Sequence, residues 1–124
     1  MELFYRGDGE KRGNTVYYYD IIVDGKTVGE CELRDGDTGQ YGNVGYRIDL
    51  DYRGRGYAAN ALGLLKNEAA ERGIERLVIC CDSDNIASQN TAKRAGAELI
   101  GEEDIPEDAE LYAYGKRKIV KYLL

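Results

Sequence analysis

The feature that most constrains the fold lies in residues 44–58, where a strand pattern runs directly into a glycine-rich turn and then a helical pattern. The strand, predicted at 43–50, places four apolar side chains on one face: Val44, Tyr46, Ile48 and Leu50. Arg53-Gly54-Arg55-Gly56 follows, and the helical pattern begins at Tyr57. Such a turn directs backbone N–H groups, a helix N-terminus and two arginines toward one point. This arrangement suits a phosphate group.

Length and composition indicate a single globular domain spanning residues 1–124. The chain is 43% hydrophobic and 32% charged, which is typical of a folded protein with one modest core. No apolar run approaches the roughly 18 residues needed to cross a bilayer, so no membrane segment is expected. The opening Met1-Glu2-Leu3-Phe4 does not resemble a signal peptide. We therefore expect a cytoplasmic protein whose three cysteines are reduced.

Charge and histidine content exclude several functional classes. The net charge of −6 argues against nucleic acid as a partner, because phosphate backbones require a basic face, and it is better suited to a cationic partner. The chain contains no histidine. This excludes catalysis by a Ser-His or Cys-His pair and removes the usual zinc ligands, so we expect no metal.

The remaining patterns predict a mixed α+β domain. Strands are expected at 1–6, 15–23, 27–34, 43–50, 76–82, 97–101 and 116–123, and helices at 57–72 and 85–95, the second capped by Asp84 or Asn85. Polar loops are expected at 7–14, 35–42 and 102–114, the last acidic. The order β-β-β-β-α-β-α-β-β gives a mixed, mostly antiparallel sheet with helices largely on one face. A β-α-β crossover predicts that 43–50 and 76–82 run parallel.

The glycine-rich turn alone is a weak signal. It lacks the Gly-Lys-Ser/Thr ending of a P-loop, and it lacks the third glycine and the acidic partner of a dinucleotide-binding fingerprint. A tight structural turn and a plain nucleotide-phosphate site are the alternatives. Small residues at Ala58 and Ala59 favour a ligand, because they let it lie close to the backbone.

Two motifs together resemble one family. Residues 45–58 resemble the acetyl-CoA-binding motif of the GNAT superfamily of N-acetyltransferases, Arg/Gln-x-x-Gly-x-Gly/Ala. Residues 84–88 and 93–97 resemble that superfamily's second motif, in the branch that includes ribosomal-protein N-terminal acetyltransferases. The resemblance covers roughly residues 16–101. It implies a GNAT fold and direct transfer of an acetyl group from acetyl-CoA to a primary amine, on a small molecule or a peptide.

The resemblance also implies roles for individual residues. The backbone of residues 48–50 pairs with pantetheine, the N–H groups of residues 54–58 hold the pyrophosphate, and the two arginines of the turn add charge. Asn85 binds the pantetheine arm or acts as a plain helix cap, and Ser88 supports that helix end. The predicted cofactor-binding set is Ile48, Asp49, Leu50, Arg53, Gly54, Arg55, Gly56, Tyr57, Ala58, Asn85 and Ser88.

The sequence departs from the family at both proton-transfer positions. Asn43 stands where many members have a glutamate, and Ala92 stands where many have a tyrosine. Glu30, Glu32 and Asp49 are the nearby carboxylates, and we nominate Glu32 and Asp49 to relay a proton through water. Each is otherwise a solvated strand residue. The tyrosines at 17–19 and Tyr46 line an amine pocket or simply pack.

A second departure concerns the fold. GNAT members usually carry two helices between the first two strands, whereas only residues 7–14 separate them here. The fold is therefore expected to be truncated near its N-terminus. A homodimer is expected to cover the exposed face, through the tyrosine-rich strand or the last strand. The alternative function is a CoA-binding sensor or interaction module without efficient turnover.

Overall fold

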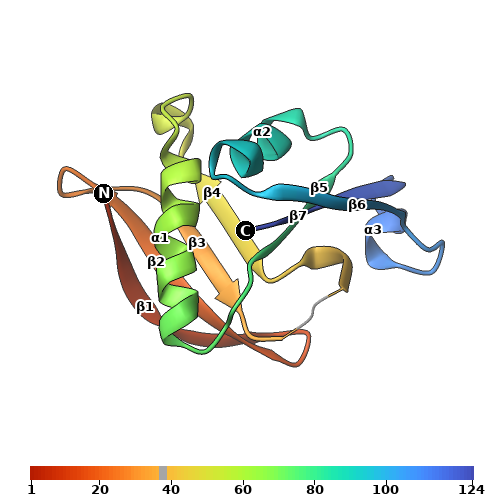
Figure 1. The fold of residues 1–124 in the computed structure, drawn as a ribbon, viewed down its shortest axis with the longest axis horizontal. Coiled ribbons are helices and arrows are strands. Elements are labelled where there is room, and N and C mark those ends of the chain that lie inside the picture. The colour runs from red at the N-terminus through yellow and green to blue at the C-terminus, as the bar shows by residue number, and fades with distance from the viewer. Residues whose placement is uncertain (37–38) are drawn as a thin grey trace.

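The computed structural model describes residues 1–36 and 39–124 and contains two antiparallel sheets (Figure 1). Residues 37 and 38, within the turn predicted at 35–42, lie outside the described residues. The first sheet has the order β1 (Glu2–Lys11), β2 (Asn14–Val23), β3 (Lys26–Arg34), β4 (Val44–Ile48). The second has the order β5 (Val78–Asp82), β7 (Lys118–Leu123), β6 (Glu98–Asp104). The helices are α1 (Tyr57–Glu71), α2 (Ile86–Arg94) and α3 (Glu110–Ala113), with 3-10 turns at Gly39–Tyr41 and Leu50–Tyr52.

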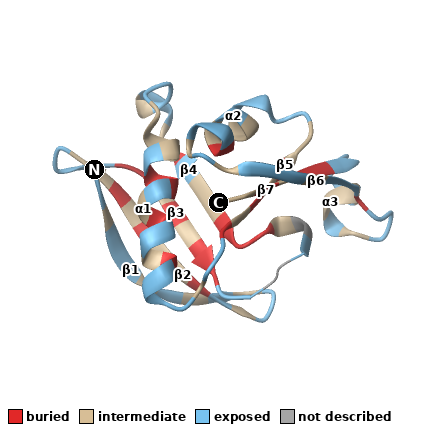
Figure 2. Cartoon of the chain, viewed as in Figure 1, coloured by how far each residue is buried: buried red, intermediate tan, exposed pale blue. Residues whose placement is uncertain are grey.

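Helix α1 lies across one face of the four-stranded sheet, and the main core forms between them (Figures 1 and 2). Because side chains alternate along a strand, every second residue of β2 and β3 faces the helix. The buried residues of the helix are Ala61, Leu62, Leu65 and Ala69, and they pack with strand residues that include Tyr19, Ile21, Cys31 and Leu33. This confirms the predicted amphipathic helix at 57–72. Among the described residues, no helix combines the length and apolar character needed to cross a membrane.

The first hairpin is longer than predicted. The expected loop at 7–14 is wrong, because β1 continues to Lys11 and pairs with β2 as far as Lys11–Asn14. Its polar residues take part in an antiparallel ladder, which satisfies their backbone groups without apolar side chains. A register shift between Tyr5 and Gly7 absorbs one residue, and Gly7 has φ 127°. The sequence predicted that the segment between the first two strands is too short for two helices. The structure agrees, since only Arg12 and Gly13 separate β1 from β2.

Strands β4 and β5 were predicted to run parallel, and no parallel ladder forms between them. Every ladder among the described residues is antiparallel, and one isolated bridge, Gly42–Ile79, joins the two strands. The buried Asn43 holds this junction. Its side-chain amide donates to the Arg76 carbonyl (2.8 Å), and its oxygen accepts from the Val78 N–H (2.7 Å). Beyond this junction the sheets separate.

Two boundaries also differ from the sequence prediction. Strand β4 ends at Ile48, and Leu50 lies in a 3-10 turn and is exposed rather than on the apolar strand face. The acidic loop predicted at 102–114 contains the end of β6 and the short helix α3. The last strand, β7, lies between β5 and β6, so both of its edges are paired and it offers no free edge to a second subunit.

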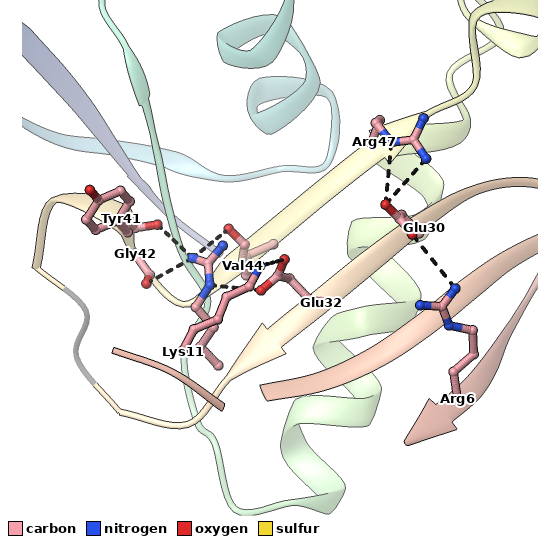
Figure 3. A network of polar contacts seen from close by, with 9 residues as sticks. Arg6, Lys11, Glu30, Glu32, Tyr41, Gly42, Val44 and Arg47 are labelled. Atoms are coloured by element: carbon pink, nitrogen blue, oxygen red, sulfur yellow. Dashed lines mark hydrogen bonds and ion pairs between the residues drawn. The ribbon is translucent and has the colours of Figure 1, made fainter. Parts of the chain in front are cut away.

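The sheet face opposite α1 is mainly charged, with Phe4 and Tyr18 as its aromatic residues. Glu30 on β3 lies between Arg47 (3.4 Å) and Arg6 (3.9 Å), and Glu32 pairs with Lys11 (2.9 Å) (Figure 3). Tyr17 and Tyr19 instead face α1, where the Arg72 guanidinium lies over the Tyr17 ring and donates to the Tyr19 hydroxyl (3.0 Å). The tyrosine-rich strand therefore does not present an apolar surface for dimerisation on its open side.

We predict that Asn43→Ala lowers the free energy of unfolding by about 1–3 kcal/mol, because it leaves a part-buried carbonyl and a part-buried N–H without their side-chain partners. Urea unfolding followed by circular dichroism measures the change. Asn67→Ala is the matched control: this residue is exposed within α1, where alanine is the better helix former. Equal stability of Asn43→Ala and the parent chain would contradict the proposed junction.

Candidate functional site

A cavity of about 770 Å³ lies in the gap between β4 and β5. Its walls include residues on both faces of β4, with Tyr46 and Ile48 on the α1 side and Gly45 and Arg47 on the opposite side. The first turn of α1 and the start of α2 also line it, through Ala58 and Ser88 among others. The separation of the two strands therefore brings both sequence motifs to one cavity.

The glycine-rich turn forms one end of this cavity. Gly54 and Gly56 have φ values of 81° and 78°, a backbone region that favours glycine, and Gly56 caps the N-terminus of α1. Arg53 donates from Nε to the Ile48 carbonyl (2.8 Å), which fixes the turn against the end of β4. Arg94, from the last turn of α2, approaches the same glycine: its Nη1 lies 3.6 Å from the position of a Cβ on Gly56. This end thus combines backbone N–H groups with two cations.

The predicted cofactor residues fall into two groups. Eight line the cavity, namely Ile48, Arg53, Gly54, Gly56, Tyr57, Ala58, Asn85 and Ser88. Three do not, namely Asp49, Leu50 and Arg55. Arg55 turns back onto its own loop, where it donates to the Asp51 carbonyl (3.5 Å) and lies beside the Tyr52 ring. Asn85 acts as the N-cap of α2, since its side-chain oxygen accepts from the Ser88 N–H (3.0 Å), and it lines the cavity as well.

The centre of the cavity holds a pair of hydroxyl groups. The Tyr46 hydroxyl and Ser88 Oγ are 2.7 Å apart, and they join β4 to α2 across the gap. Burial raises the pKa of Tyr46, and the Ser88 hydrogen bond offsets this only in part. Tyr46 is therefore protonated at neutral pH and available as a proton donor. Cys81 lies beside the pair, and burial raises its pKa, with an opposing contribution from the Ser88 hydroxyl.

The two carboxylates nominated for proton transfer lie outside this cavity. Glu32 forms ion pairs with Lys11 (2.9 Å) and Arg34 (3.1 Å) and lines a second, smaller groove of about 210 Å³. Asp49 pairs with Arg47 (3.3 Å) and lines neither cavity. The structure instead places Asp82 of β5 in the main cavity, where Lys116 pairs with it (2.9 Å). The hydrogen bond from Lys116 lowers the pKa of Asp82, so this carboxylate is ionised.

Sequence reasoning missed several residues that line the cavity, including four charged ones. Arg34, Asp82, Arg94 and Lys116 all line the cavity but were not predicted there. For Arg94 a signal existed, because it lies within the second motif, on the last turn of a helix whose first turn was assigned to the site. For the other three, the sequence offered no signal, because their positions depend on how β3, β5 and β7 are arranged. Among the described residues, no group of three or more metal-ligating side chains is present.

Comparison with known proteins assigns the family. Residues 2–98 match the family model described as an acetyltransferase (GNAT) domain, so the chain belongs to this family. No curated protein matches the chain. The fold is that of GNAT acetyltransferases, several of which have solved structures similar to this chain.

Three solved structures illustrate the similarity. The microcin C7 self-immunity acetyltransferase MccE, in complex with acetyl-CoA and AMP, is 26% identical with a TM-score of 0.68, over 88% of this chain and 60% of that one. The Salmonella typhimurium acetyltransferase that modifies the N-terminal serine of ribosomal protein L7/L12 is 26% identical with a TM-score of 0.67, over 91% and 64%. RimL, a ribosomal L7/L12 acetyltransferase in complex with CoA, is 25% identical with a TM-score of 0.69, over 88% and 61%. The present chain therefore spans less than two thirds of each of these structures.

We predict that two thiols react slowly with a thiol reagent near neutral pH. Burial raises the pKa of Cys80 to about 11 and that of Cys31 to about 12, so at pH 8 only about one Cys80 thiol in a thousand is ionised. Stopped-flow mixing with a disulfide reagent, from pH 7 to 11, measures the rates. The reaction rate of Cys80 should rise as the pH approaches 11, at a lower pH than that of the buried Cys31. The urea-unfolded chain is the control, and equally fast reaction of the folded chain at pH 8 would contradict the prediction.

Proposed function

We propose that this chain transfers the acetyl group of acetyl-CoA directly to a primary amine. The observation that carries the proposal is the meeting of two elements at one cavity: the glycine-rich turn at the start of α1 and the Asn85-capped start of α2. The family assignment supports the same reaction class. We place the protein in the cytoplasm on the basis of its composition.

The residues present fit a CoA molecule. The turn supplies N–H groups with no side chain at Gly54 or Gly56, and a Cβ on Gly54 would meet nothing within 4 Å, so a pyrophosphate has room to approach. Arg53 and Arg94 add positive charge at this end. The edge of β4 that faces β5 carries no ladder, so the pantetheine arm can pair with it as an added strand. Asn85 and Ser88 then lie along the arm.

The reaction forms a C–N bond, breaks the C–S bond of the thioester and releases CoA thiol. An alkylamine with a pKa near 10.4 must first lose a proton, which costs roughly 4–5 kcal/mol at pH 7. Asp82 is an ionised carboxylate in the cavity, but the hydrogen bond from Lys116 lowers its pKa and makes it a weak base, so the proton leaves through water to the solvent. A backbone N–H of β4 stabilises the oxyanion, and the Tyr46–Ser88 hydroxyl pair donates a proton to the leaving sulfur.

A CoA-binding module without efficient turnover is the second candidate. The positions of Glu32 and Asp49 favour this candidate. Both residues were nominated to relay a proton, and both form ion pairs outside the main cavity. A homodimer also remains a prediction, to be tested by analytical ultracentrifugation. The ion pairs of the open face and the paired edges of β7 lend no support to the two surfaces first expected to form it.

We predict that Gly56→Glu abolishes acetyl-CoA binding measured by calorimetry. The substitution strains a position with φ 78° and places a carboxylate at the phosphate end of the cavity. Gly63→Glu is the matched control, because it adds the same charge at an exposed position of α1 with open space around it. If the parent chain binds neither acetyl-CoA nor CoA, or if both variants bind equally well, the cofactor assignment is wrong.

We predict that Tyr46→Phe and Ser88→Ala each lower kcat by about 10- to 100-fold, while the dissociation constant of acetyl-CoA changes little. Release of free thiol against a panel of primary amines and N-terminal peptides gives the rate, and calorimetry gives the affinity. The double variant should be no slower than the slower single variant, since the hydroxyls act as one unit. Tight binding with no thiol release across the panel would support the module instead.

A further inference from the structure

We propose that the acceptor amine carries an oxyanion, either a carboxylate or a phosphate, and that Arg34 holds it. This inference names an acceptor class and rests on the proposed acetyl transfer. Arg34 is the last residue of β3, and it lies at the end of the main cavity away from the glycine-rich turn, with Tyr41, Leu111 and Lys116.

The Arg34 side chain is buried but only partly satisfied. It is 10% exposed, and its Nε donates to Glu32 Oε2 (3.1 Å). Its Nη1 donates to the carbonyls of Tyr41 (3.0 Å), Val44 (3.3 Å) and Gly42 (3.4 Å). A guanidinium has five N–H donors, and two of them belong to Nη2. Within the part of the chain that the structure describes, Nη2 has no hydrogen-bond partner, and leaving buried donors unpaired is costly.

The free Nη2 lies over Gly45, where the two cavities meet. A Cβ on Gly45 would be 2.8 Å from Nη2 and 2.9 Å from Glu32 Cγ, so the missing side chain leaves a space that is bordered by both side chains. Gly45, Tyr46 and Arg47 line both the 770 Å³ cavity and the 210 Å³ groove. A ligand that enters from the open sheet face can therefore contact Nη2 while its amine reaches the gap beside Tyr46.

The competing possibility is an acceptor with a second positive charge, held by the acidic residues of the same face. Those carboxylates are already paired. Glu32 is engaged by Lys11 and Arg34, and Glu30 is engaged by Arg47 and Arg6 (Figure 3). In the main cavity Asp82 is engaged by Lys116. A cationic group would have to displace an existing partner, whereas an oxyanion adds a charge-assisted hydrogen bond to a donor that lacks one.

The net charge of −6 does not oppose this assignment. Salt screens exposed charges beyond about 8 Å under physiological conditions, so the overall charge influences the approach of a ligand more than its contacts. At contact distance the local charges decide. The cations Arg34, Lys11 and Arg47 are matched in number by their carboxylate partners Glu32, Glu30 and Asp49, so the paired charges near Nη2 leave no excess negative charge against an oxyanion.

The test compares matched amines that differ only at the far end. The probes are ω-amino acids with two to five methylenes, the corresponding ω-amino amides and diamines, and O-phosphoethanolamine as the phosphate form. Thiol release with acetyl-CoA gives kcat/KM for each probe. We expect the acid of at least one chain length, or the phosphate, to exceed the neutral and cationic probes by about tenfold or more. An equal or greater rate with the amides or diamines at every length overturns the proposal.

Two variants and one control assign the preference to Arg34. Arg34→Met removes the donor, and Gly45→Ala places a methyl group against Nη2 while leaving the charge in place. Each should reduce the preference to about twofold or less, and circular dichroism checks that each variant folds. Arg47→Gln removes an exposed positive charge that lines both cavities and should change the preference less than threefold. If Arg47→Gln loses the preference for the acid to the same extent, the preference comes from the general positive potential of the site. That result overturns the assignment to Arg34.

A binding measurement separates this inference from the proposed function. The ω-amino acids and ω-amino amides are titrated into the parent chain and into Gly45→Ala, with and without CoA, while NMR follows the Tyr46 amide signal, which both chains contain. If the acid binds more tightly than the amide, and Gly45→Ala removes this difference, the result supports the Arg34 site even when no amine is acetylated. Equal or absent binding of both probes overturns it even when acetyl-CoA binds and some amine is acetylated. Failure of acetyl-CoA to bind contradicts the proposed function alone.

Discussion

The junction at Asn43 is the constraint on which the rest of the structure depends. Its amide bonds to Arg76 and Val78 tie the start of β4 to the start of β5, and one bridge beside it is all the pairing these strands share. Because strands twist and no further ladder holds them together, the two sheets diverge beyond this point. The divergence leaves an unpaired edge on β4 and opens the cavity. A position that departs from the usual family residue thus shapes the site without touching the chemistry.

The local half of the site could be predicted from the sequence. The turn at 53–56 and the cap at Asn85 depend on neighbouring residues: glycines that tolerate positive φ and a side chain that reaches its own helix. The family resemblance predicted that the turn and the cap contact the same ligand. The prediction failed where it extended local patterns too far, as at Leu50, which continues the strand alternation in sequence but lies in a 3-10 turn.

The non-local half could not be predicted. The Tyr46–Ser88 contact joins residues 42 positions apart, and Arg34 reaches the cavity because its Nη1 is held by carbonyls of the following loop. No sequence period marks such contacts. Glu32 was nominated for its chemistry alone, and two cations neutralise it: Lys11 on β1, and Arg34 two residues along the same strand. An ionisable residue can be identified from sequence, but its partners follow from the register of β1, β3 and β4.

The charged sheet face explains how the fold tolerates the absence of the helices that usually cover it. An apolar face would need a cover, whereas ion pairs at the surface are solvated and contribute only about 0–1 kcal/mol each. The stabilising burial is therefore concentrated on the α1 side, around Leu62, Leu65 and Leu33. In the described part of the chain, no helix lies over β4 on the side away from α1 (Figure 1). We therefore expect the selection of an acceptor to depend on contacts close to the β4–β5 gap, and the free side of Arg34 is the contact that we propose.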